Sequence, residues 1–299
     1  MSESKKIKFA VLLKPGEAQP AIERVAQYAR MSPDIGVVAI RVINEFTEQN
    51  KDNLAARTRA EFDALRRGVE AIRNLELKII FDKDVPQSFI KECEEGDYDL
   101  AIISANRRST LRDLFVSTID STIMRGLSKP LLVVKNTQVS ATLGEVILMA
   151  VDFEESAHLS ALDDYLLNSA RRFAELCNGH IHVVNCVSPL NRGRMSGKTT
   201  PSRLLDSSGV DRVNIHERIV FDFARNHGID FDSVHVVEGR MDEMIPRLCE
   251  KLDARMVCMG TSPKSSFFGA MDSSASEMVL EQIKGDLFIV NSEHLNDKS

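Results

Sequence analysis

The chain carries the same pattern twice, and this internal repeat constrains its fold more than any other feature. Residues 104–120 line up with residues 260–276 without a gap, and Leu-Leu-Val-Val at 131–134 corresponds to Leu-Phe-Ile-Val at 287–290. A chain of 299 residues is long enough for two domains, at about 100–200 residues each. We interpret the sequence as an internal duplication, with one domain at 1–138, a second at 145–292 and a short polar connection.

Each copy alternates short apolar runs with amphipathic helical patterns. The apolar runs of the first copy lie at 7–13, 35–42, 77–81, 100–103 and 131–134. Those of the second copy lie at 146–151, 181–187, 233–237, 256–259 and 287–290. The second helix of the first copy is predicted to run from Leu54 to Leu75, with Val69 and Ile72 on its buried face. This alternation predicts an α/β fold of two tandem, doubly wound, five-stranded parallel sheets.

The stretch 254–291 predicts a ligand site. It is read as a strand, a loop beginning at Gly260, a helix and a second strand. Ser273 and Ser274 can cap the helix, and its first N–H groups and its dipole favour a phosphate. Gly285 is expected to end the helix. In an open α/β sheet, ligands bind at the carboxyl ends of the strands, so we expect the site there.

The loop of this stretch resembles that of the universal stress protein family. Members of that family place G-x-x-G, nine residues and G-[S/T] between their last two strands, and Gly260 matches the first glycine. Pro263 and Ser273 stand where the second and third glycines belong. The second copy is also similar to the tandem E-type members, in the runs HVVEGRMDEMIP, MGTSP and DLFIVN. The resemblance covers nearly the whole chain and implies two domains of the adenine nucleotide alpha hydrolase-like fold, paired through their last strands as a pseudo-dimer.

The resemblance also implies which residues hold the ligand. In ATP-binding members an Asp after the first strand and the backbone of the second strand hold adenine, and in this chain Asp152 and Val184 match. Asp152 can also be a turn residue that binds its own backbone. In the first copy Lys14 replaces the acid, so adenine recognition is not expected there. The candidate ligand-binding residues are therefore Asp152, Val184, Gly239, Gly260, Thr261, Ser273 and Ser274.

The departures in the loop weaken a nucleotide site. Pro263 removes an N–H donor, and Ser273 is poor wherever glycine has a positive φ. At ~1–2 kcal/mol each, the two changes reduce affinity roughly 30- to 1000-fold. We expect ATP or AMP to bind weakly or not at all.

Composition and motifs exclude several other classes. A net charge of -6 gives no general attraction to nucleic acid, and no apolar run approaches the roughly 20 residues of a membrane span. Five scattered cysteines without C-x-x-C spacing, and no recognisable signal peptide, favour a reducing cytoplasmic location. We find no nucleophile paired with a histidine base and no carboxylate pair at metal spacing. The run from Gly193 to Gly197 is one residue too short for a P-loop.

Three histidines are the remaining candidate for a metal site. His180 and His182 alternate onto one face of a strand, and His235 belongs to a predicted neighbouring strand. No cysteine or carboxylate completes the group at metal-site spacing. We therefore interpret them as sheet-edge histidines and expect no metal.

The sequence thus favours a non-catalytic cytoplasmic universal stress protein of tandem type, with one weakened nucleotide-type site in its second domain and a role in stress resistance. The alternative is a regulatory interaction module that holds a partly apolar ligand or none, since Phe267, Phe268 and Met271 lie in the loop. A weak nucleotide hydrolase is the third reading. A homodimer is compatible with all three.

Overall fold

The computed structural model describes residues 7–16, 18–105, 118–135, 146–152, 159–187, 212–261 and 275–296. The predicted loop residues Pro263, Ser273 and Ser274 lie outside this part of the chain, as does the interrupted P-loop-like run at 193–197.

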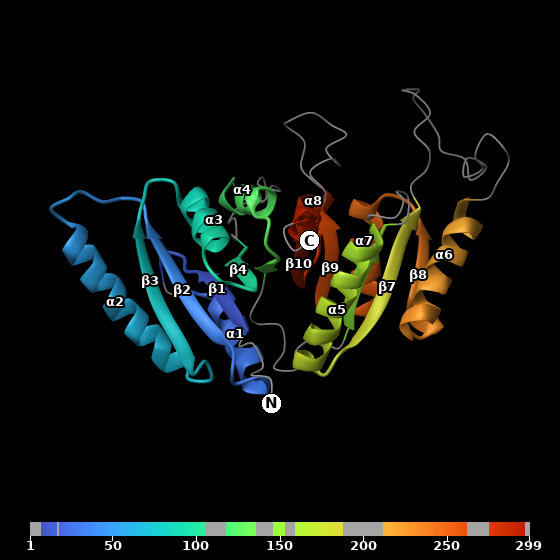
Figure 1. Cartoon of the computed structure of the whole chain (residues 1–299), viewed down its shortest axis with the longest axis horizontal. Helices are drawn as coiled ribbons and strands as arrows, with labels where there is room; N and C mark the ends of the chain where they lie inside the picture. The colour runs from blue at the N-terminus through green and yellow to red at the C-terminus, as the bar shows by residue number, and fades with distance from the viewer. Residues whose placement is uncertain are drawn as a thin grey trace, which may run out of the picture.

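Ten strands form one sheet in the described part of the chain, in the order β3-β2-β1-β4-β5-β10-β9-β6-β7-β8 (Figure 1). The strands of the first half are β1 Lys8–Leu12, β2 Gly36–Ile43, β3 Asn74–Phe81, β4 Leu100–Ser104 and β5 Leu131–Val134. Those of the second half are β6 Val146–Val151, β7 His180–Val187, β8 Val234–Glu238, β9 Met256–Thr261 and β10 Asp286–Asn291. Within each half all neighbours are parallel, as predicted.

Helices cover both faces of this sheet, which makes each half doubly wound. One face carries α1 Pro20–Met31, α2 Lys51–Gly68, α5 Leu159–Cys177 and α6 Arg212–His227. The other carries α3 Val85–Glu95, α4 Thr118–Gly126, α7 Met241–Leu252 and α8 Ala275–Gln282. A 3-10 turn at Phe231–Ser233 precedes β8, and α9 Glu293–Asn296 follows β10. The helices α2 and α6 stand at opposite ends of the elongated molecule (Figure 1).

The two halves join through β5 and β10, which are antiparallel. Phe288 pairs with Leu132, flanked by Leu287 with Val133 and Ile289 with Leu131. These pairs are symmetric about Leu132 and Phe288, which are equivalent residues of the repeat. The predicted pseudo-dimer through the last strands is therefore present.

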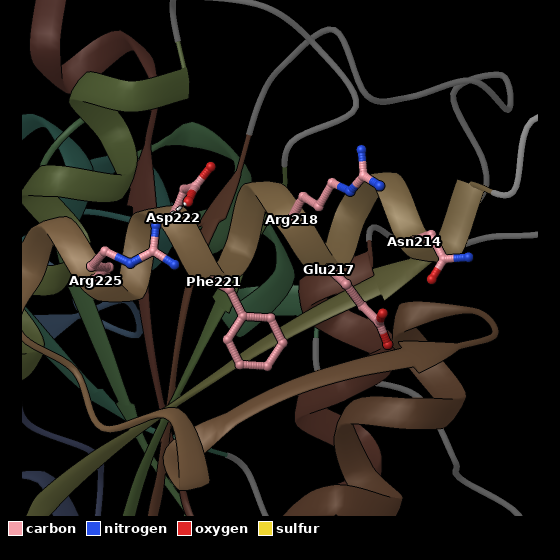
Figure 2. A pocket seen from close by; sticks show the side chains of 6 residues that line it. All are labelled: Asn214, Glu217, Arg218, Phe221, Asp222 and Arg225. Atoms are coloured by element: carbon pink, nitrogen blue, oxygen red, sulfur yellow. Dashed lines mark hydrogen bonds and ion pairs between the residues drawn. The ribbon is translucent and has the colours of Figure 1, made fainter.

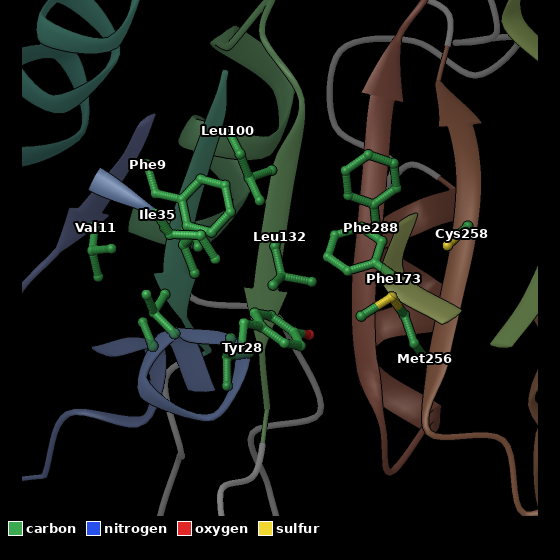
Figure 3. Close-up of a cluster of buried hydrophobic side chains, with 14 of the residues drawn as sticks. Phe9, Val11, Tyr28, Ile35, Leu100, Leu132, Phe173, Met256, Cys258 and Phe288 are labelled. Carbon is green, nitrogen blue, oxygen red and sulfur yellow. The ribbon is translucent and has the colours of Figure 1, made fainter. Parts of the chain in front are cut away.

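Aromatic side chains carry one hydrophobic core across this seam (Figure 3). The Tyr28 ring of α1 lies 5.8 Å from that of Phe173 in α5, and Phe173 lies 5.1 Å from Phe288 in β10. All three side chains are buried. Because such large side chains contribute strongly to core stability, the halves are packed together rather than merely linked.

The predicted limits of the second helix are wrong. Helix α2 ends at Gly68, and Leu75 belongs to β3. Val69 and Ile72 are buried as expected, but they lie in the connection, where the Ile72 N–H donates to the Val69 carbonyl at 2.9 Å. Glycine and β-branched residues are weak helix formers, so the helix stops although apolar residues continue.

Gly285 has a different role from the predicted one. Helix α8 already ends at Gln282. A Cβ at Gly285 would lie 2.2 Å from the Arg255 carbonyl oxygen, so the close approach of two backbone segments requires glycine there.

Candidate functional site

Asp152 lies where the sequence places it, at the carboxyl end of the second half of the sheet. It directly follows β6 and its side chain is exposed. Val184 lies two residues short of the level of Asp152 in β7, paired with Ala150 on one side and His235 on the other. Val184 is 0% exposed as a whole residue, so its backbone is covered as well as its side chain, and its part in holding a ligand stays a prediction.

Two buried polar side chains that the sequence analysis missed lie next to Asp152. Asn185 pairs in register with Val151 and donates from Nδ2 to the Val151 carbonyl oxygen at 2.9 Å. Its Oδ1 lies 2.8 Å from His216 Nδ1 of α6. Both residues are buried, and the contact requires a protonated Nδ1 if Asn185 Oδ1 accepts. This pair joins β7 to α6 and to the carbonyl of Val151, the residue that precedes Asp152.

Asp163 of α5 is a third polar group that the sequence analysis missed. Its side chain is 3% exposed, and Oδ2 has no hydrogen-bond partner in the described structure. Burial, together with the negative charges of Asp152 and Asp164, raises the pKa of this carboxyl to about 7. A buried carboxyl with a perturbed pKa is typical of functional sites, although structural networks also produce it.

Local packing explains why glycine occupies positions 239 and 260 of the predicted site. Gly239 has φ +141°, and a Cβ there would meet Met244 at 2.7 Å. A Cβ at Gly260 would meet the end of the Leu162 side chain at 2.6 Å. Thr261 ends β9, and its carbonyl oxygen accepts from the Ser292 N–H at 2.9 Å. Gly260 and Thr261 therefore lie at the same carboxyl edge as Asp152. Gly239 also lies at the carboxyl end of its strand, directly after β8.

The equivalent position of the first half is filled by its own side chains. The Lys14 ammonium donates to the Ala105 carbonyl oxygen at 2.8 Å, across the end of β1. Ser104, which replaces the loop glycine, accepts the Ala21 N–H at 2.8 Å and so satisfies the start of α1. Burial lowers the pKa of Lys14, and the Asp120 carboxylate opposes this effect. In both halves a side chain of the second strand donates to the carbonyl oxygen at the end of the first strand. Arg41 donates to Leu13, and Asn185 donates to Val151.

The three histidines lie near the edge strand, as predicted. His182 Nδ1 and His235 Nε2 are 2.9 Å apart and their rings are stacked, with His180 beside them. Burial lowers the pKa of both His182 and His235, assisted by the neighbouring positive charges. No group of three or more metal-ligating side chains occurs among the described residues.

Two hollows of the described surface lie along α6. One, with a volume of about 330 Å³, runs along the outer face of α6, and all six side chains that line it come from that helix (Figure 2). The other, of about 410 Å³, lies between α5 and α6 and includes Asp163 in its wall. No helix within the described ranges is long and apolar enough to cross a membrane.

Fold and repeat together define a tandem of two doubly wound α/β domains joined into one sheet. The model of the universal stress protein family matches residues 4–135 and 145–291, and the chain therefore belongs to that family. Its curated relatives include Universal stress protein E of Escherichia coli K12, which is 23% identical over 72% of this chain and 68% of its own length. The corresponding Salmonella typhi protein is 24% identical over 74% and 70%.

Solved structures agree with this assignment at the level of the fold. The putative universal stress protein from Pseudomonas aeruginosa UCBPP-PA14 superimposes with a TM-score of 0.73, at 19% identity, over 98% of both chains. Within its family the chain is thus a tandem protein similar to the E type.

Proposed function

We propose that the chain is a non-catalytic cytoplasmic stress-response protein that binds one small ligand of nucleotide type, weakly, at the carboxyl edge of its second half. The observation that carries this proposal is the contrast between two equivalent positions. The Lys14 ammonium is bound to the Ala105 carbonyl oxygen in the first half, whereas Asp152 of the second half is exposed. A ligand would have to displace a half-buried lysine in one half and meets an exposed carboxylate in the other.

The chemistry around Asp152 favours a ligand that donates hydrogen bonds. The Asp152 carboxylate is an acceptor, and the nearby buried side chains of Asn185 and His216 contact each other. A nucleobase with an exocyclic amine offers such donors to the carboxylate. The negative charge works against a phosphate placed beside it, so the base would contribute more affinity than the phosphates.

Binding of ATP, AMP and adenosine by isothermal titration calorimetry tests the proposal. We expect weak binding to the unmodified protein, loss of binding in Asp152→Ala and no change in Lys14→Ala. Gly260→Val is a poor probe because its side chain would collide with Leu162. Retained binding in Asp152→Ala with loss in Lys14→Ala would place the site in the first half.

The loop departures give a test by gain of function. Restoring glycine at Pro263 and Ser273 together should strengthen ATP binding by roughly 30- to 1000-fold, since one N–H donor and a positive φ become available. Tight, micromolar ATP binding by the unmodified protein would contradict this reasoning. Mass spectrometry of any small molecule released on denaturation would identify a different ligand, or none, and would then favour an interaction module.

A further inference from the structure

The hollow between α5 and α6, the α5–α6 groove, has an acidic and partly apolar wall. Its volume of about 410 Å³ falls within the range of about 300–1,000 Å³ that is usual for small-molecule sites. Three aspartates line it, and no lysine or arginine does so among the described residues. The wall includes Asp163 and Asp164 of α5 and Ile219, Asp222, Phe223 and His227 of α6.

Asp163 is the buried acceptor of this groove. Its side chain is 3% exposed, and its Oδ2 has no hydrogen-bond partner in the described structure. A buried polar atom without a partner destabilises the fold. Burial, together with the charges of Asp152 and Asp164, raises the pKa of this carboxyl to about 7. A cationic donor in the groove would supply both the missing hydrogen bond and the missing opposite charge.

The rest of the wall limits the shape of that donor. Ile219 is 39% exposed and Phe223 is half-buried, so both offer apolar surface to a hydrocarbon chain. More than half of the Asp164 and Asp222 side chains is exposed, and each already pairs with a side chain of α6. These two acids therefore attract a second cation only weakly, through water.

We propose that the α5–α6 groove binds a short aliphatic diamine, with one ammonium group on Asp163 and the chain along Ile219 and Phe223. The second ammonium group lies toward Asp164 and Asp222. A metal ion fits less well, because no group of three or more metal-ligating side chains occurs in the described part of the chain. This inference is independent of the nucleotide-type ligand proposed for the carboxyl edge.

Three small molecules of similar length test the chemistry by isothermal titration calorimetry on the full-length protein. Putrescine is the diamine, butylamine carries one ammonium group, and the butanediol with terminal hydroxyl groups is the uncharged counterpart. We expect putrescine to bind about 2- to 5-fold more tightly than butylamine, since the second ammonium group is exposed to solvent. The butanediol should not bind measurably.

Two variants of the wall and one matched control place the site. Asp163→Asn should weaken putrescine binding about 10- to 100-fold, because a hydrogen bond to a charged acceptor is lost. Ile219→Lys should weaken it as well, since it adds a cation to the groove at a partly exposed position. Glu175→Gln is the control: Glu175 is an exposed acid of α5 that does not line the groove, and binding should not change.

The affinity for putrescine should also depend on pH. The charged or titratable groups around Asp163 are Asp152 after β6, Asp164 in α5, and Asp222 and His227 in α6. Ionisation of Asp163 should increase the affinity about 10- to 100-fold between pH 5 and pH 8. His227→Gln should keep most of this increase, whereas Asp163→Asn should lose most of it.

Several results would overturn the inference. They are no binding of putrescine to the unmodified protein at millimolar concentration, equal binding of putrescine and the butanediol, and an equal loss of affinity in Glu175→Gln. Unchanged affinity in Asp163→Asn or in Ile219→Lys would also overturn it. Circular dichroism shows whether each variant folds, and if Asp163→Asn does not, Ile219→Lys decides alone. None of these results depends on whether adenosine or ATP binds elsewhere.

Discussion

Replacing Asp163 with asparagine should change how the stability of the protein depends on pH. The folded state raises the pKa of this carboxyl from 3.8 to about 7, first through burial and then through the charges of Asp152 and Asp164. Between these values the folded state binds a proton that the unfolded state has released. Stability therefore falls as the pH rises from about 4 to about 7, and Asp163→Asn should remove that fall.

The size of the effect follows from the same numbers. An increase from 3.8 to about 7 corresponds to roughly 4 kcal/mol at about 1.4 kcal/mol per pKa unit. The asparagine amide has donors of its own, and leaving them unsatisfied in a buried position costs about 1–3 kcal/mol. That cost is the same at every pH. The variant should therefore gain stability relative to the parent as the pH rises from 5 to 8, and it should be the more stable of the two at pH 8.

Urea unfolding at pH 5 and pH 8 measures this directly. The difference between the two mutational effects should be roughly 2.7 kcal/mol, because the constant amide cost cancels and about two pH units lie between pH 5 and the folded-state pKa of about 7, at about 1.4 kcal/mol each. Asp222→Asn is the control, since its ion pair with Arg225 is exposed, at 64% and 66% of the side chains, and such pairs contribute about 0–1 kcal/mol. Parallel pH profiles for the parent and Asp163→Asn would refute a buried, titrating carboxyl.

Two further predictions concern the edge histidines and a backbone contact. Burial lowers the pKa of His182 and His235, so the folded state binds fewer protons than the unfolded state, and stability should be lost as the pH falls below about 6.5. Urea unfolding at pH 7.5 and pH 5.0 should show a smaller loss of stability in His182→Gln than in the parent, and the same loss in both proteins would contradict this. Gly285→Ala should destabilise by about 3 kcal/mol or more through its clash with the Arg255 backbone, at 2.2 Å. Gly68→Ala is the control, because a Cβ there has nothing within 4 Å, and it should change the free energy of unfolding in urea by less than about 1 kcal/mol. The same effect in Gly285→Ala and Gly68→Ala would show that the backbone around Gly285 can shift.

The fold could be predicted because its signals are repeated and local. The alternation of strands and helices occurs twice, and the resemblance to the universal stress protein family implied the pairing of Leu131–Val134 with Leu287–Val290, which the structure has. The end of the second helix could not be predicted from periodicity. Val69 and Ile72 continue the helical spacing, but they are buried by packing after the helix has ended. Tertiary contacts there override a local pattern.

The site was only partly predictable. Asp152 was singled out because it matches the Asp that follows the first strand in ATP-binding members of the family, and its ligand role stays a prediction. Its neighbours belong to segments far apart in the sequence. Asn185 interrupts an apolar strand and Asp163 lies beside an apolar helical stripe, so each is a polar residue where burial is expected. That signal marks a buried polar group. It does not say which groups meet, because the contact with His216 depends on how α6 packs against β7.

The seam between the halves has a consequence for symmetry. Ser121 and Glu277 are equivalent residues of the repeat, and they face each other with a hydrogen bond of 2.6 Å. In a dimer of identical chains, an acid at this position would meet its own copy, and two buried carboxylates would repel each other. One covalent chain removes that restriction, because each side can change independently while the linker keeps the partner at a high effective concentration. The two halves of a tandem chain can therefore be asymmetric at this contact, with an arginine, Arg125, and a serine of one half donating hydrogen bonds to an acid of the other.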